Sequence, residues 1–162
     1  MAAKKTAVLG KIVPDFTLPS SAGEDFVLSG HRGGPVILYF YPKDNTPGCT
    51  LEGQEFNKLL ASFKKLNATV LGVSRDSLKS HGKFIDQCGF RFDLLSDAEE
   101  EACGLFDVIR EKNMYGKKVL GVERSTFLID AEGRLAAEWR KVKAAGHAAE
   151  VLEKLKSLTK SK

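Results

Sequence analysis

The feature that most constrains the fold of this chain is one unbroken apolar run at residues 36–41, Val-Ile-Leu-Tyr-Phe-Tyr. Turn-forming residues bound the run on both sides, Gly-Gly-Pro at 33–35 and Pro42. An apolar run without polar alternation is typical of a strand that is buried on both faces of a sheet. Because such a strand needs other elements packed on each face, the run predicts an α/β domain.

The rest of the chain alternates strand-like and helix-like stretches and contains no internal repeat. Apolar runs between turn residues predict further strands at 16–18, 26–28, 69–74, 124–130 and 134–139. Helical spacing predicts helices at 46–66, 77–87 and 97–106 and from 146 onward, with a polar loop between 107 and 123. The first two strands should pair as an N-terminal β-hairpin. Since 162 residues suit one domain, we expect a single domain over 1–162, with flexible tails at 1–5 and 159–162.

Charge and hydropathy exclude two classes of partner. The formal net charge is +4, but four lysines at the chain ends account for it, and no basic stripe with aromatics lies inside the domain. We therefore expect no nucleic-acid binding. The longest apolar run has six residues, whereas a membrane-spanning helix needs about 20, and the N-terminus lacks the apolar stretch of a secretory signal. We expect no membrane association and a cytoplasmic location.

Three cysteines, an odd number with wide gaps, argue against both a disulfide framework and paired zinc-binding motifs. No two of the three histidines have the spacing of metal ligands on a helix, so neither a metal nor another cofactor is expected. The remaining question is whether any thiol is reactive. The positions concerned are Cys49, Cys88 and Cys103.

Cys49 falls in the first turn of the predicted helix that begins after Thr46. Free N–H groups and the helix dipole at such a place lower the pKa of a cysteine thiol. Thr46 can direct its hydroxyl into the same turn, Pro42 and Pro47 stiffen the approach, and Gly48 allows close contact with backbone donors. These residues describe a small pocket for an anion or a polar oxygen. Position alone leaves open that Cys49 is a small buried hydrophobic residue.

The pattern Pro42-x-x-x-Thr46-x-x-Cys49 resembles the active-site motif of the peroxiredoxins. Further strings resemble the Q-type subfamily, also called bacterioferritin comigratory proteins; they lie at 39–44, 47–50, 72–76, 94–97, 113–117 and 124–130. The resemblance implies a thioredoxin-like fold, with a central mixed sheet flanked by helices, and a thiol-dependent peroxidase used in antioxidant defence. It covers nearly the whole chain.

The resemblance also implies a role for each residue of the motif. The Cys49 thiolate would attack a peroxide oxygen, expel water or an alcohol and become a sulfenic acid. Pro42 would shield the thiolate, and Thr46 would hydrogen-bond the peroxide. Gly48 and Cys49 would lend backbone N–H groups, and Arg124 would supply positive charge that stabilises the leaving oxygen.

Arg124 and Glu52 can also be weighed from their positions. Strand alternation would place Arg124 on one apolar face with three neighbours, where an unpaired charge is costly; these are Val122, Thr126 and Leu128. A thiolate would be a suitable partner for it. Glu52, one turn after Cys49, matches a position that is commonly acidic in the subfamily. It would anchor Arg124 or the pocket, or else be an ordinary solvated helix residue, and both alternatives stay open.

The resemblance requires a second thiol that resolves the sulfenic acid. Many Q-type members carry it five residues after the peroxidatic cysteine, but that position is Gln54 here. Cys88, on the following helix, is the expected resolving residue, and the first turn after Thr46 should unwind so that the two thiols can meet. Cys103 is the rival, although its apolar neighbours suggest a packed core residue. A one-cysteine cycle with an external thiol is the third alternative.

Other functions and partners follow from the same residues. Thioredoxin is the expected reductant, with glutaredoxin as the other candidate, and the subfamily suggests a monomer. A disulfide reductase would need C-x-x-C, but Thr-Leu-Glu follows Cys49. A cysteine hydrolase would need a histidine, and nothing in the sequence places His81 or His147 beside Cys49. A non-catalytic redox sensor or holdase using the same cysteine stays open.

Overall fold

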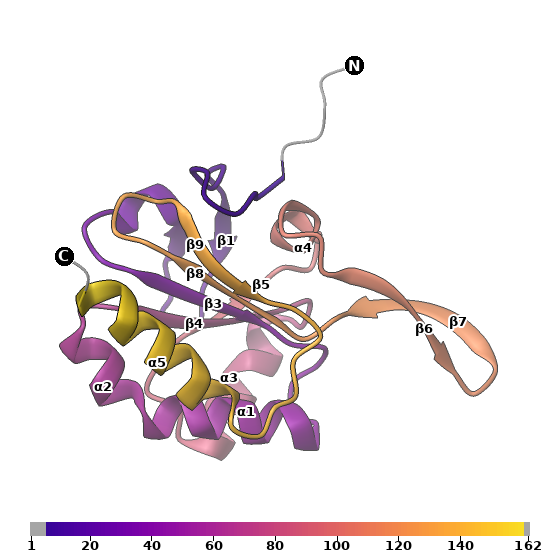
Figure 1. Ribbon diagram of the computed structural model, residues 1–162. Coiled ribbons are helices and arrows are strands. Elements are labelled where there is room, and N and C mark those ends of the chain that lie inside the picture. Colours follow the sequence, from indigo (N-terminus) through magenta and orange to yellow (C-terminus); the bar gives the residue numbers. More distant parts are fainter. Residues whose placement is uncertain (1–5, 161–162) are drawn as a thin grey trace.

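A five-stranded mixed sheet forms the centre of the computed structural model, which describes residues 6–160 (Figure 1). Its strand order is β5-β4-β3-β8-β9, with β3, β4 and β5 parallel and β8 and β9 antiparallel to their neighbours. The strands are β3 (Val36–Phe40), β4 (Thr69–Ser74), β5 (Leu94–Ser96), β8 (Ser125–Ile129) and β9 (Leu135–Trp139). All five residues of β3 are buried, so the apolar run of the sequence is the middle strand of the sheet, as predicted.

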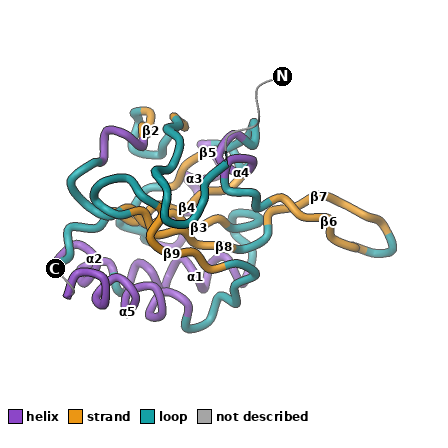
Figure 2. Tube along the Cα trace, turned by 45° about the horizontal axis from the view of Figure 1, so that its top comes forward, coloured by secondary structure: helices purple, strands orange, loops and turns teal. Residues whose placement is uncertain are grey.

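Alternate residues of β3 point into two separate cores. Ile37 and Tyr39 face a layer of long helices, which Figures 1 and 2 show on one side of the sheet. These helices are α1 (Pro47–Lys58), α2 (Leu60–Lys65), α3 (Leu78–Cys88) and α5 (His147–Lys160). Leu38 and Phe40 face the opposite side, which is covered by shorter elements. These are the hairpin β1 (Thr17–Pro19) and β2 (Asp25–Val27), the 3-10 turn η1 (Leu28–His31) and the short helix α4 (Glu101–Leu105).

The local signals in the sequence place most of these elements correctly. Ser77 caps α3 by accepting a hydrogen bond from the Ser80 N–H, and Gly89 ends the helix in the left-handed conformation. The mixed sheet flanked by helices and the N-terminal hairpin are both confirmed. Among residues 6–160, no helix has the length and apolar character needed to cross a membrane.

The structure corrects three predicted elements. The helix expected at 46–66 is two helices, because the backbone leaves the helical conformation at Leu59. The expected polar loop is a hairpin of β6 (Ile109–Met114) and β7 (Lys117–Val122) that projects away from the sheet (Figure 2). Its turn residues, Tyr115 and Gly116, both have positive φ, as a tight hairpin turn requires.

The third correction concerns the C-terminal tail. Helix α5 continues to Lys160, two residues into the segment predicted to be flexible, because Leu158 still packs against the helix-side core and the Thr159 hydroxyl bonds to the Lys156 carbonyl. The tail expected at 1–5 and the rest of the tail at 161–162 lie outside the described residues.

Candidate active site

The first turn of α1 presents the Cys49 thiol and two free backbone donors. Thr46 is the N-cap with extended backbone, and Pro47 is the first helical residue. The Thr50 N–H makes the first bond of the helix, to the Thr46 carbonyl at 2.8 Å. Since Pro47 has no N–H, helix geometry leaves the N–H groups of Gly48 and Cys49 without an acceptor inside the helix. Cys49 itself is buried, with 1% of its surface exposed.

Arg124 connects this thiol to a buried carboxylate. Its Nη2 atom lies 3.5 Å from the Cys49 Sγ atom, and its Nη1 atom lies 2.7 Å from the Glu52 Oε1 atom. The Glu52 side chain is fully buried and that of Arg124 is 16% exposed. Glu52 is therefore not a solvated helix residue: it anchors the guanidinium that faces the sulfur. The Arg124 guanidinium therefore contacts the Cys49 sulfur directly and can donate a hydrogen bond to it.

Arg124 provides a hydrogen-bond partner for only one of the two carboxylate oxygens of Glu52. Burial raises the pKa of its carboxyl to about 7, although the adjacent guanidinium acts in the opposite direction. Its second oxygen, Oε2, is buried without a hydrogen-bond partner among the described residues. The acid can therefore bind a proton near neutral pH, within one helical turn of Cys49.

Gly48 has a structural role that the sequence did not reveal. A Cβ atom at this position would lie 2.9 Å from the Arg124 Nη2 atom, closer than real Cβ atoms approach other heavy atoms. Because Gly48 has no side chain, the guanidinium has room to lie beside Cys49. The sequence predicts backbone access and an N–H donor at this glycine, but not the space for the guanidinium.

The Thr46 hydroxyl bonds away from the helix. It donates to the Lys43 carbonyl at 2.9 Å and makes no capping bond to a helical N–H. The expectation that it points into the first turn is therefore wrong, because the Lys43 carbonyl turns toward it within the loop. With its proton committed, the hydroxyl oxygen keeps lone pairs that can accept a hydrogen bond. Pro42 is half-buried at the start of the same loop.

Arg124 reaches the site by a different route from the one predicted. It lies at the junction between β7 and β8, where its carbonyl accepts a bond from the Val142 N–H at 2.9 Å. Val122 packs in the opposite core, so it does not share a face with Thr126 and Leu128. Strand alternation therefore does not account for the position of Arg124, because the strand begins only after it.

Cys88 is the last residue of α3 and is half-buried at the edge of the helix-side core. Burial raises the pKa of its thiol. The Gly89 carbonyl, directly after it, accepts a bond from the Asn57 side chain at 3.2 Å. Asn57 follows Cys49 by eight residues in α1, about 12 Å along the helix axis. Cys49 and Cys88 are both free thiols on the same side of the sheet.

Cys103 lies in the opposite core. Its side chain is completely buried in α4, and its N–H donates to the Asp97 carboxylate at 2.7 Å. Burial, followed by the nearby Asp97 charge, raises the pKa of this thiol well above its ordinary value. The central sheet separates Cys103 from Cys49, because the two residues belong to the cores on its two faces.

Neither buried histidine bonds to Cys49. The His147 Nε2 atom is 2.7 Å from the Thr126 Oγ1 atom, and its Nδ1 atom faces Glu150 at 3.1 Å. The His81 Nδ1 atom faces the Asp44 carboxylate at 2.7 Å. The hydrolase alternative thus has no base beside the thiol. The sequence reasoning missed the Asp44–His81 pair, although His81 stands three residues before Phe84 on the apolar side of α3, where a buried histidine needs a polar partner.

Comparison with known proteins gives consistent matches along the chain. The model of the AhpC/TSA family matches residues 9–138. Peroxiredoxin Bcp of Xanthomonas campestris is 56% identical over 146 residues, which cover 90% of this chain and 91% of that protein. Peroxiredoxin Bcp of Bacillus subtilis is 47% identical over 154 residues, covering 95% of this chain and 98% of that protein.

Solved structures agree with these relatives. The bacterioferritin comigratory protein of X. campestris, studied for alkyl peroxide reduction, superposes with a TM-score of 0.87 at 54% identity and covers 93% of this chain and 98% of that one. A variant of Xylella fastidiosa PrxQ superposes with a TM-score of 0.90 at 48% identity, over 96% of this chain and 99% of that one. The resemblance noted in the sequence and the thioredoxin-like fold are thereby confirmed. The chain belongs to the AhpC/TSA family and, within it, to the Bcp or Q-type peroxiredoxins, and it is a thiol peroxidase.

Proposed function

We propose that Cys49 is the peroxidatic residue of this peroxidase and that it reduces hydrogen peroxide and small organic hydroperoxides. The observation that carries the proposal is the 3.5 Å contact between the Cys49 sulfur and the Arg124 guanidinium, at a helix N-terminus. A thiolate is the reactive form of cysteine, and both the cation and the helix end favour it. Of the three cysteines, Cys49 is the one in contact with an arginine side chain.

The reaction is a displacement at oxygen. The thiolate attacks the terminal oxygen of the peroxide, so that an S–O bond forms as the O–O bond breaks. Sulfur loses two electrons and becomes a sulfenic acid, while the leaving oxygen takes up a proton and departs as water or an alcohol. Organic hydroperoxides are included because one relative is described by its alkyl peroxide reduction activity.

The surrounding groups suit the charge that develops in this step. Negative charge grows on the leaving oxygen, and fixed donors stabilise it without reorganisation. Arg124 and the N–H groups of Gly48 and Cys49 are such donors. The Thr46 oxygen can accept a hydrogen bond from the O–H group of the peroxide. Pro42 limits the access of water to the thiolate.

We further propose that Cys88 resolves the sulfenic acid through an intramolecular disulfide. Cys88 lies on the same side of the sheet as Cys49, whereas Cys103 lies on the other, and this arrangement supports Cys88 over its rival. Bridging needs Cα atoms within about 7 Å. The end of α3 contacts Asn57, two turns along α1 from Cys49, so the first turns of α1 must unwind for the bond to form.

Thioredoxin is the proposed reductant of this disulfide, with glutaredoxin as the second candidate, and the subfamily supports a monomeric enzyme in antioxidant defence. A cytoplasmic location is proposed because three widely spaced cysteines, an odd number, give no disulfide framework of the kind that secreted proteins use.

Peroxide turnover coupled to thioredoxin tests these assignments in the wild type and in C49S, C88S and C103S. We expect C49S to abolish turnover and C103S to leave it unchanged. C88S should lose steady-state turnover but still be oxidised once by peroxide. Mass spectrometry after one equivalent of peroxide should show a Cys49–Cys88 bridge in the wild type.

Each assignment has an outcome that contradicts it. Turnover by C49S would overturn the peroxidatic assignment. Full turnover by C88S would point to the one-cysteine cycle with an external thiol. Oxidation of Cys49 without multiple turnovers with either reductant would favour the sensor or holdase.

A further inference from the structure

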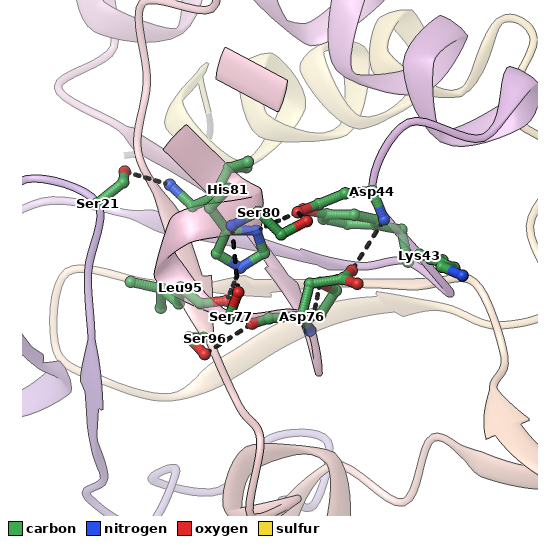
Figure 3. Close-up of polar contacts among 12 residues, drawn as sticks. Ser21, Lys43, Asp44, Asp76, Ser77, Ser80, His81, Leu95 and Ser96 are labelled. Atoms are coloured by element: carbon green, nitrogen blue, oxygen red, sulfur yellow. Dashed lines mark hydrogen bonds and ion pairs between the residues drawn. The ribbon is translucent and has the colours of Figure 1, made fainter. Parts of the chain in front are cut away.

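A buried polar cluster joins the active-site loop to α3 and takes no part in the chemistry described above (Figure 3). We call it the loop anchor; its members are Tyr41, Asp44, Ser80 and His81. Asp44 lies in the loop five residues before Cys49, and His81 lies in the first half of α3. Their side chains are 3% and 0% exposed and meet with a distance of 2.7 Å between Oδ2 and Nδ1.

The Asp44 carboxylate is held from three sides. It accepts hydrogen bonds from the Tyr41 hydroxyl, from Ser80 Oγ at 2.8 Å and from His81 Nδ1. The backbone N–H of Asp44 donates to the Asp76 carboxylate at 2.8 Å, and Asp76 accepts a bond from the hydroxyl of Ser74, the last residue of β4. Tyr41 directly follows β3, and Ser80 lies in α3. Asp44 thus ties the loop to the ends of two strands and to α3.

Both ring nitrogens of His81 face acceptors. Nδ1 faces the Asp44 carboxylate, and Nε2 faces the Leu95 carbonyl at 2.8 Å. The ring therefore links the loop at Asp44 to the backbone of β5 at Leu95. Removing one partner of a buried hydrogen-bonded pair leaves the other partner unsatisfied, which is costly.

The helix that holds the anchor also carries the proposed resolving cysteine. Cys88 follows His81 by seven residues in α3, about 10 Å along the helix axis. Once the first turn of α1 has unwound, Cys49 is tied to Asp44 by five residues, which span at most ~17 Å. This reach exceeds the ~10 Å along α3 that separates Cys88 from His81, the partner of Asp44.

We propose that Asp44 and His81 are positioning residues for the resolution step: they keep the unwound Cys49 segment tethered to α3 and so raise the effective concentration of Cys88. The inference rests on the proposed pairing of Cys49 with Cys88. In the step itself the Cys88 sulfur attacks the sulfenic sulfur of Cys49, an S–S bond forms, and the S–O bond breaks with release of water.

The expected size of the effect follows from the tether length. The Asp44 N–H also bonds to Asp76, so loss of the side-chain contacts frees Asp44 only when this backbone bond opens as well. The next fixed point is then Tyr41, whose N–H donates to the Val73 carbonyl at 3.0 Å, and the tether grows from five to eight residues. Effective concentration falls with about the −3/2 power of tether length, which gives a decrease of about twofold on full release. The reaction of Cys49 with peroxide should change less than this.

The experiment compares H81Q and D44N with the wild type. Rapid quenching with thiol alkylation measures the rate of Cys49 oxidation and the rate of disulfide formation separately. We expect the ratio of the second rate to the first to fall by up to about twofold. Because overoxidation to sulfinic acid competes with resolution, the peroxide concentration that overoxidises half of the protein should fall by the same factor. S80A, which removes one bond to Asp44 but keeps the contact between Asp44 and His81, should show a smaller change in the same direction.

Controls separate this role from a general loss of stability. D97N makes the same isosteric change at a buried carboxylate in the opposite core and should leave the ratio of rates unchanged. In the wild type, the ¹⁵N shifts of the His81 ring should be the same in the reduced protein and in the Cys49–Cys88 disulfide form, because the contact with Asp44 is kept.

The outcomes distinguish the anchor from the pairing on which it rests. Equal ratios in H81Q and the wild type, faster resolution in H81Q, or a changed His81 ring spectrum in the disulfide form would overturn the anchor while the pairing stands. If the wild type forms no Cys49–Cys88 bridge, the resolving assignment is wrong and the anchor fails with it.

Discussion

At the scale of single residues, Glu52 makes the free energy of unfolding depend on pH. Burial raises the pKa of its carboxyl to about 7, above the ordinary value near 4.5. The folded protein therefore holds a proton that the unfolded chain releases, so this contribution to stability is complete below pH 4.5 and is lost as pH rises through 7. The loss amounts to about 3 kcal/mol. In E52Q, which cannot ionise, the free energy of unfolding measured with urea should lack this decline between pH 5 and 8, and parallel profiles for the two proteins would contradict it.

Gly48 gives a second prediction at the residue scale. In G48A the new Cβ would displace the end of the Arg124 side chain, which is flexible, so stability should hardly change. Moving the guanidinium away from Cys49 weakens the stabilisation of the thiolate and of the leaving oxygen. We expect the rate constant of Cys49 with hydrogen peroxide to fall about tenfold, less than when an oxyanion donor is lost completely. Competition kinetics and thermal unfolding test the two parts, and an unchanged rate with an unchanged melting temperature would disprove the role of the missing Cβ.

At the scale of elements, the contact between α1 and the segment after α3 depends on Gly53. A Cβ atom there would lie 2.4 Å from the Phe90 ring, which is packed between Phe84 and Phe92 and cannot move freely. G53A should therefore destabilise the protein by about 1–3 kcal/mol, as overpacked core substitutions do. G82A is the matched control, because no atom lies within 4 Å of its Cβ position in α3, and it should stabilise by up to about 1 kcal/mol. Urea unfolding gives both values, and equal effects of the two substitutions would refute the packing argument.

The same scale shows which elements a sequence can predict. The residues that specify strand β3 and the caps of α3 lie within or directly beside these elements, so the sequence predicts both. The sequence does not predict the β6–β7 hairpin, because only half of its strand residues are polar or charged, in no regular alternation, and the hairpin projects away from the sheet (Figure 1). The division of the helix at Leu59 also lacks a proline or glycine signal.

At the scale of the whole molecule, the central sheet separates the core that contains Cys49 from the core on its opposite face. The motif predicts Cys49, Thr46 and Arg124 as neighbours because their spacing resembles a known family. It does not predict the Asp44–His81 pair, since two residues 37 positions apart meet only when α3 packs beside the loop. The distribution of the cysteines between the two faces is equally a property of the topology, which no local pattern records.

That distribution predicts how Cys88 and Cys103 respond to an alkylating reagent. Cys88 is half-buried at the end of a helix, whereas Cys103 is fully buried behind the sheet with a thiol pKa raised first by burial and then by Asp97. Iodoacetamide should therefore modify Cys88 in the native protein and reach Cys103 only when the whole domain unfolds. Mass spectrometry of timed samples at increasing urea should show Cys103 labelling follow the global unfolding curve, with Cys88 labelled long before it. Labelling of Cys103 at a rate close to that of Cys88 without urea would mean that the α4 side of the core opens independently, and Cys103 would again be a candidate for resolving Cys49.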